Sequence, residues 1–194
     1  MASDVSICSN ALLALGDKPI SSFDEATQIG GLDRARLCAN LYPQVRNNLL
    51  RRLQPNCAKA RVILAPDSIA PAFDYTNRFL LPGDFLRIVS IGQKDDADDY
   101  QLEGRYILAN VSTLYLRYVY QNENVASWDS MLVSAMELAM KAVLAYPITK
   151  STAEKDSCKQ ELEMYLRQYR AIDGQDIPPE TLGDFPLLNA RYNG

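Results

Sequence analysis

Few side chains in this sequence could act as nucleophiles or metal ligands. The four cysteines, Cys8, Cys38, Cys57 and Cys158, lie far apart without a CxxC pair, and the 194 residues include no histidine. Structural zinc sites combine closely spaced cysteines with each other or with histidines. The lack of histidine also removes the Ser-His and Cys-His pairs that activate nucleophiles. We therefore interpret Cys8, Cys38 and Cys158 as small apolar side chains buried on helices, and expect no metal and no cofactor.

Carboxylates are the remaining candidates for acid-base chemistry. Two of the 24 acidic residues could hydrolyse a glycoside without histidine if their side chains lie at the required separation. The run from Lys94 to Asp99 is rich in aspartate, but it lacks the register, the glycine and the glutamate of an EF-hand calcium loop. A charged hairpin tip that resists edge-to-edge aggregation explains the run as well. The sequence names no catalytic residue, and we do not expect an enzyme.

A group of basic residues could bind rather than catalyse. Positions 34 to 61 hold seven basic residues and no acidic one, namely Arg34, Arg36, Arg46, Arg51, Arg52, Lys59 and Arg61. In a chain of net charge −4 and pI near 4.9 this is a real segregation of charge. It predicts either a basic surface facing DNA or an acidic partner, or solvated arginines satisfied by local carboxylates. The segment lacks the interleaved aromatics of single-strand binders and any helix-turn-helix signature.

Two helical patterns precede the centre of the chain. Ser3 can cap a first helix, which Gly16 and Pro19 should end. A second pattern keeps one apolar face up to Leu53, across Pro43, which should kink or split that helix because proline removes a backbone hydrogen bond.

From Ala58 to Tyr120 the apolar period changes to two, which indicates about five antiparallel strands in a small sheet or barrel-like insertion. The first clear strand carries Phe73, Tyr75, Phe79 and Leu81 on its inward face. Pro82-Gly83-Asp84 should turn the chain into a returning strand, and Glu103-Gly104 should form a second hairpin. The expected strands also include Arg61 to Leu64, Phe85 to Ile91 and Leu114 to Tyr120.

The stretch from Val125 to Tyr146 predicts a central helix, because it is apolar around most of its circumference. Its few polar residues fall on one seam, namely Ser127, Ser130, Ser134, Glu137 and Lys141. The recurring polar seam argues against a bilayer span. In a monomer the seam would face water, with Glu137 and Lys141 paired one turn apart, whereas in an oligomer it could face the next subunit.

After Pro147, Ser151 to Glu154 has the form of a capping box that opens an amphipathic helix. The pattern as a whole predicts an α+β fold in which residues 1–57 and 122–172 form an antiparallel helical bundle, 58–121 a β insertion, and 173–194 an extended tail. The tail is more apolar than an inert one needs to be, with Phe185, Leu187, Leu188 and Tyr192.

Several segments carry a resemblance to a known family. They are NALLALGDKPISSFDE, LYPQVRNNLLRRLQP with Pro43 and Arg46, FLLPGDFLRIVSI, LYLRYVY, and SWDSMLVSAMELAMKAVLAYPITKS followed by the amphipathic helix. In order and spacing they resemble tail tubular protein A, the head-to-tail adaptor of short-tailed bacteriophages, over most of the chain. None of them is a catalytic motif. The family usually has an aromatic residue shortly after the second helix, where this chain reads LQPNCAKAR.

The resemblance implies a structural virion protein of the tail or neck, made in the host cytoplasm. Such adaptors form a ring, expected to be dodecameric, between the portal protein and a tail nozzle of the tail tubular protein B kind, with double-stranded DNA passing through the lumen. The segment from Arg34 to Arg61 would then meet a neighbouring copy or the DNA. The apolar tail residues would dock on the portal or on an adjacent copy, and the β insertion would contact the tail nozzle.

Two other functions fit parts of the pattern. A virion-associated glycan hydrolase would need a pocket holding a carboxyl group whose pKa is raised. A neck connector from a long-tailed phage would share the helical bundle and differ mainly in its tail partner. The start MASDVSICSN has no basic n-region, so we expect neither a signal peptide nor a membrane partner.

Overall fold

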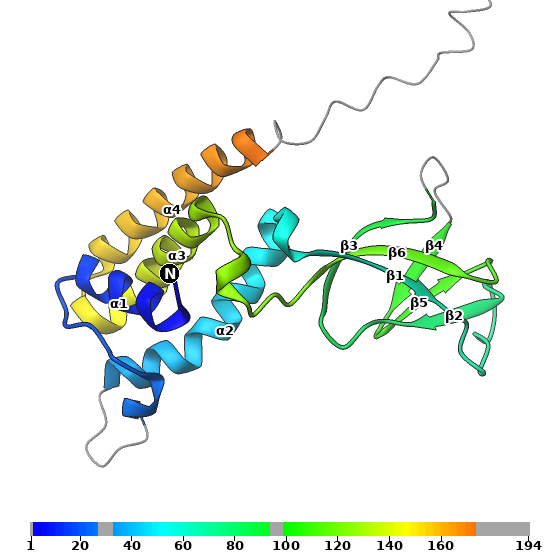
Figure 1. The fold of residues 1–194 in the computed structure, drawn as a ribbon, viewed down its shortest axis with the longest axis horizontal. Helices are drawn as coiled ribbons and strands as arrows, with labels where there is room; N and C mark the ends of the chain where they lie inside the picture. The colour runs from blue at the N-terminus through cyan, green and yellow to red at the C-terminus, as the bar shows by residue number, and fades with distance from the viewer. Residues whose placement is uncertain (1, 27–32, 94–98, 174–194) are drawn as a thin grey trace, which may run out of the picture.

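The computed structural model describes residues 2–26, 33–93 and 99–173. Within them the fold is mixed α+β, with four α-helices and two antiparallel sheets of three strands each. The helices come from both ends of the chain and gather at one end of the molecule, while the strands gather at the other (Figure 1). The chain crosses between the two regions after α2 and again before α3 (Figure 1).

The α-helices are α1 (Asp4–Ala14), α2 (Asp33–Leu53), α3 (Ser130–Thr149) and α4 (Thr152–Asp173). Short 3-10 turns are η1 (Phe23–Ala26), η2 (Asn56–Ala58) and η3 (Val125–Ser127). The strands are β1 (Lys59–Leu64), β2 (Asn77–Leu80), β3 (Phe85–Ile91), β4 (Tyr100–Glu103), β5 (Tyr106–Ala109) and β6 (Leu114–Tyr120).

Helix α3 lies at the centre of the helical region and packs against α1, α2 and α4. Leu132, Met136, Met140 and Leu144 follow one another at helical spacing and are fully buried. Removing this apolar surface from water is what holds the three other helices on α3. By length and composition α3 could also cross a membrane, a test that the core helix of a soluble protein passes equally.

The predicted bounds of the central helix were wrong at both ends. Val125–Ser127 forms η3, and α3 begins only at Ser130, after Asp129 accepts a hydrogen bond from the backbone N–H of Leu132 at 2.8 Å. At its other end α3 runs through Pro147 to Thr149. The full burial of Leu144 and Ala145 outweighs the hydrogen bond that proline removes.

Helix α1 begins and ends as its sequence predicts. Ser3 and Ser6 exchange hydrogen bonds in a capping box. At the other end Gly16 has φ of +79°, its N–H donates to the carbonyl of Leu13, and the N–H of Asp17 donates to that of Leu12. This pair of bonds is a Schellman motif, which favours glycine because of the positive φ. Helix α2 is not split at Pro43 and continues to Leu53.

The strands form two open sheets, so the barrel-like arrangement was wrong. Sheet A has the order β1-β6-β3 and sheet B the order β2-β5-β4. Strand β3 is not the hairpin partner of β2, because β2 pairs with β5 and β3 with β6. Phe79 on β2 lies opposite Ile107 on β5, and both side chains are fully buried. The turn at Pro82-Gly83-Asp84 therefore carries the chain from one sheet to the other.

The two sheets bury a common apolar core that includes Phe79 and Ile107 from sheet B and Leu114 and Leu116 from sheet A. The predicted inward face of the first strand is correct only for Phe79 and Leu81, since Phe73 is 77% exposed and precedes the strand. Because alternate residues of a strand face opposite sides, the odd-numbered residues Arg61 and Ile63 of β1 lie on the outer face of sheet A, together with Tyr115 and Arg117 of β6. Val119, farther along β6, is instead fully buried in the core of the helical region.

At the junction of the two regions one backbone carbonyl accepts two side-chain hydrogen bonds. The carbonyl of Cys57 accepts from the hydroxyl of Tyr120 at 3.1 Å and from the amide of Asn122 at 2.7 Å. Asn122 is 2% exposed, and its side-chain oxygen Oδ1 accepts a hydrogen bond from the backbone N–H of Asn124. These bonds hold the turn after α2 against the segment that follows β6 by polar contacts.

Candidate binding surface on the outer face of sheet A

Four of the seven basic residues between positions 34 and 61 are ion-paired within the chain. The pairs are Arg34 with Asp17 at 3.1 Å, Arg36 with Asp33 at 4.0 Å, Arg46 with Glu123 at 2.8 Å and Arg52 with Glu163 at 2.5 Å. For these four, carboxylates of the same chain supply the neutralising charge. Three of the pairs join separate parts of the helical region, so they also have a positional role.

Arg46 is the most buried of these cations, with a side chain 7% exposed. It reaches from the middle of α2 to Glu123, in the segment that enters α3. Hydrogen bonds from Gln121 and from Arg46 lower the pKa of Glu123. The pair therefore ties α2 to the chain crossing from the sheets, and Arg46 is not available to a partner.

The other three basic residues, Arg51, Lys59 and Arg61, make no ion pair with a carboxylate in the described part of the chain. Arg51 donates to the backbone carbonyl of Leu86 on β3, and Lys59 donates to the side-chain oxygen of Asn56 at 2.8 Å. Arg61 is exposed on β1. All three lie where α2 ends and sheet A begins.

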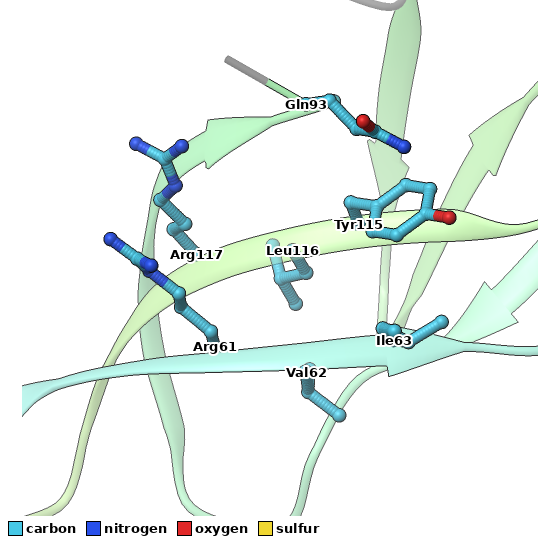
Figure 2. A pocket seen from close by; sticks show the side chains of 8 residues that line it. Arg61, Val62, Ile63, Gln93, Tyr115, Leu116 and Arg117 are labelled. Atoms are coloured by element: carbon cyan, nitrogen blue, oxygen red, sulfur yellow. The ribbon is translucent and has the colours of Figure 1, made fainter.

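Arg61 lies directly opposite Arg117, on the neighbouring strand β6. Figure 2 shows the two guanidinium groups side by side on the same face of the sheet. Arg117 makes no ion pair either, among the residues that the structure describes. Like charges directly opposite each other across two strands destabilise the pair. The two arginines therefore form a site at which an added anion would be favourable.

Sequence reasoning did not single out Arg117. The signal for it was an arginine in the middle of the strand LYLRYVY, where an outward-facing position alternates with apolar ones. What could not be predicted is its partner, because the register that brings Arg117 opposite Arg61 depends on how the strands pair. A further unpredicted cation, Arg87 on β3, lies opposite Val119, two residues along β6 from Arg117, and donates to the carbonyl of Arg51 at 3.5 Å.

A groove of about 550 Å³ runs beside the two arginines. Ile63 and Tyr115, which are also directly opposite each other, line it and are 65% and 37% exposed. Its far wall is the end of β3, where the N–H of Gly92 donates to the carbonyl of Tyr115 at 3.0 Å and Gln93 follows (Figure 2). The groove thus combines two guanidinium groups on adjacent strands with exposed apolar surface.

The other residues considered as metal ligands or docking residues lie only partly within the described ranges. Cys8, Cys38 and Cys158 are buried and free, which confirms their interpretation as core side chains. Within the described ranges no group of three cysteines, aspartates or glutamates could hold a metal ion. The aspartates 95, 96 and 98 of the calcium alternative lie outside the described residues. So do Phe185, Leu187, Leu188 and Tyr192 of the predicted docking tail.

The glycan hydrolase alternative needs a carboxyl group with a raised pKa. A larger groove of about 830 Å³ in the helical region does include two carboxylates, Asp17 and Asp33, and each of them is paired with an arginine. Hydrogen bonds from Arg52 lower the pKa of Glu163, and hydrogen bonds from Gln121 and Arg46 lower the pKa of Glu123. A general acid needs a raised pKa, so neither carboxyl group fits that role. The alternative stays a prediction without an observation that favours it.

The arrangement on sheet A is suited to binding rather than to bond making. Two guanidinium groups held on adjacent strands can donate to the oxygens of a carboxylate or a phosphate, and the neighbouring apolar side chains can bury part of a ligand. No protein-family model and no curated protein matches the sequence.

Proposed function

We propose that this protein is a structural adaptor that forms a ring between the portal and the tail nozzle of a short-tailed phage. The resemblance of its ordered segments to tail tubular protein A supports this proposal. So does the placement of its binding surface, since the groove on sheet A offers contacts to another chain and holds no arrangement of catalytic groups in the described residues. The ring is proposed to be dodecameric and to let DNA pass through its lumen.

The observation that carries the proposal is the exposed apolar surface of the β region. Most large apolar side chains that are exposed in the described residues belong to it, namely Ile63, Ile69, Phe73, Leu80, Val89, Tyr100, Leu102 and Tyr115. Scattered single residues would need no explanation, but their concentration in a small two-sheet region is typical of an interaction site. The β region projects away from the helices and is therefore accessible to other chains (Figure 1).

In this proposal the helices act as an antiparallel bundle that serves as the rigid body of each subunit. Helix α3 is its axis, and the buried contacts with α1, α2 and α4 keep the body constant while other surfaces make contacts. A ring requires heterologous interfaces, in which one face of a subunit meets a different face of the next. The β region supplies one such face, with the tail nozzle or the next copy as its partner.

Reconstitution with the portal tests the proposal. The purified chain mixed with the portal protein of the same phage should produce ring-shaped particles with a central channel, visible by negative-stain electron microscopy. Phe73→Ser, which changes an exposed side chain of the β region, should weaken ring formation or the binding of the tail nozzle protein to the ring. Met164→Ser is the matched control, because Met164 is 64% exposed on α4 in the helical region. A chain that stays monomeric with portal present would contradict the proposal.

A further inference from the structure

The groove beside Arg61 and Arg117 combines positive charge with exposed apolar surface. Two guanidinium groups stand opposite each other without a carboxylate in the described chain. Beside them Ile63 is 65% exposed against Tyr115. A DNA backbone would satisfy the arginines but would leave the apolar half of the groove in contact with water. A peptide that carries both a carboxylate and an apolar side chain would satisfy both halves.

The edge of the same sheet offers a place for a peptide backbone. Strand β1 pairs only with β6 among the described strands, so its other edge presents unpaired N–H and C=O groups. An extended peptide added along such an edge gains main-chain hydrogen bonds, and its alternate side chains fall on the face of the sheet beside those of the edge strand. On β1 the outer-face side chains are Lys59, Arg61 and Ile63.

The chain itself contains a segment with the matching pattern. Between Pro179 and Pro186 lie six residues, Glu180 to Phe185, reading ETLGDF. This is the length of β1, and prolines at both flanks confine strand pairing to these six because proline cannot donate to a ladder. Alternate residues of the segment are Glu180, Leu182 and Asp184, which is an acidic, apolar, acidic series.

The spacing of this series fits β1 in both strand directions. In the antiparallel register that puts Asp184 opposite Arg61, Leu182 falls opposite Ile63. In the parallel register that puts Glu180 opposite Arg61, Leu182 again falls opposite Ile63. In each case one carboxylate lies across the new strand pair from Arg61, whose neighbour on the other side is Arg117, and one leucine lies beside the exposed Ile63.

We propose that the free edge of β1, beside the groove on sheet A, binds residues 180–185 of a neighbouring copy as an added strand. This inference rests on the proposed ring, because a ring needs one surface of a subunit to engage a different surface of the next. It names those surfaces as the outer face of sheet A and the C-terminal segment. The contact is charge-assisted, so it is sensitive to salt.

A peptide titration tests the contact on the full-length chain without the portal. The probe is a fluorescein-labelled peptide of residues 174–194, followed by fluorescence anisotropy at low salt. The wild-type chain should bind it, and Arg61→Gln combined with Arg117→Gln should weaken binding about tenfold or more, the effect of losing a charge-assisted hydrogen bond. Arg36→Gln is the matched control, because Arg36 is an exposed arginine of the helical region outside the groove, and it should leave binding unchanged.

Charge reversal separates a specific contact from general attraction. A peptide with Glu180→Lys and Asp184→Lys should fail on the wild-type chain and bind the Arg61→Glu, Arg117→Glu chain. Ile63→Ser should weaken binding of the wild-type peptide without changing its salt dependence. Circular dichroism of each variant establishes that it is folded.

Four results would overturn the proposal. They are no binding of the peptide to the wild-type chain, equal weakening by Arg36→Gln, no rescue by charge reversal, and binding of a DNA duplex with the same arginine dependence in place of the peptide. Assembly on the portal is a separate readout. Rings that form although the peptide does not bind would refute the strand contact alone, and a peptide that binds where no ring forms would refute the adaptor alone.

Discussion

Glu137 and Lys141 lie one turn apart on α3, and each binds a different neighbouring helix. Glu137 accepts a hydrogen bond from the side-chain amide of Asn10 on α1 at 2.7 Å, whereas Lys141 donates to Glu161 on α4 at 2.7 Å. The part of the polar seam formed by Glu137 and Lys141 therefore lies between helices within one subunit, whereas Ser127 and Ser130 are exposed. The pair that the sequence predicts between Glu137 and Lys141 is replaced by two contacts that orient α1 and α4.

Double-mutant cycles should show that Lys141 is coupled to Glu161 and not to Glu137. The cycle of Lys141→Met with Glu161→Gln should give a coupling energy of about 0.2–1 kcal/mol, because half of the Glu161 side chain remains in water. The cycle of Lys141→Met with Glu137→Gln should give a value near zero. Both follow from urea unfolding of the four variants in each cycle. A larger coupling for Glu137 than for Glu161 would contradict the observed contacts.

Met136 should be among the most costly residues of α3 to truncate. Its side chain is fully buried between the helices, so Met136→Ala removes apolar contacts and leaves a cavity. We expect a loss of about 2–5 kcal/mol in the free energy of unfolding. Val143→Ala on the same helix is the control. Because Val143 is 38% exposed, it should change stability by no more than about 0.5 kcal/mol. Equal losses for the two variants would show that α3 is not the core helix.

Replacing Gly16 or Gly83 by alanine should change the free energy of unfolding in opposite directions. Gly16 has φ of +79°, and an added Cβ would meet nothing within 4 Å, so backbone strain alone should decide the outcome. Gly16→Ala should lower the free energy of unfolding by about 1–2 kcal/mol. Gly83 also has open space around it and no positive φ. Gly83→Ala should therefore be neutral or stabilising by about 0.4–1 kcal/mol, since it restricts the unfolded chain. Thermal unfolding of both variants checks the signs, and a stabilised Gly16→Ala would refute the Schellman end of α1.

The stability contributed by Arg52 and Glu163 should depend on pH in the acidic range. Hydrogen bonds from Arg52 lower the pKa of Glu163 in the folded chain. A lowered folded pKa means that the contribution is present above the unfolded value of about 4.3 and is lost as pH falls through the folded value. Both side chains are more than a third exposed, so the pair should contribute only about 0.2–1 kcal/mol at pH 7.

The measurement is the difference in unfolding free energy between the wild type and Glu163→Gln. It should favour the wild type at pH 7, narrow below about pH 4, and also narrow in 1 M salt because exposed charges are screened. A difference that grows on acidification would have the wrong sign for a carboxylate stabilised in its charged form.

The sequence predicts those features whose causes are local. The cap at Ser3, the glycine end at Gly16 and the strand Leu114 to Tyr120 depend on neighbours in the chain, and the structure has each of them. The sheet partners could not be predicted, because they depend on which distant apolar faces are buried together. The burial of Phe79 opposite Ile107 removes β2 from the hairpin that its turn indicates.

The same distinction applies to the candidate site. The excess of positive charge between Arg34 and Arg61 is visible in the sequence, but which cations are neutralised is a matter of tertiary structure. Arg46 and Arg52 meet carboxylates far along the chain, at Glu123 and Glu163. Only strand register reveals that Arg61 faces Arg117. A sequence pattern can therefore identify a basic segment and still not identify the residues that remain able to bind.

Removing one arginine of the opposed pair should stabilise the free chain. Arg117→Thr keeps a residue of good strand propensity and ends the repulsion across β1 and β6, so we expect a gain of about 0.2–1 kcal/mol at low salt. The gain should shrink in 0.5 M NaCl, because screening already weakens the repulsion in the wild type. Arg78→Thr is the matched control in the other sheet. Arg78 pairs with Asp67 at 2.8 Å and lies over the ring of Tyr106, so its loss should destabilise the chain.

Urea unfolding at the two salt concentrations decides between these expectations. If Arg117→Thr destabilised the chain at both concentrations, Arg117 would have a stabilising partner and the groove would not be short of an anion. If Arg117→Thr and Arg78→Thr changed the free energy of unfolding by the same amount, the ion pair of Arg78 would not distinguish it energetically from Arg117. Opposite signs at low salt that converge at high salt would show that the outer face of sheet A retains unfavourable positive charge, which a bound carboxylate would relieve.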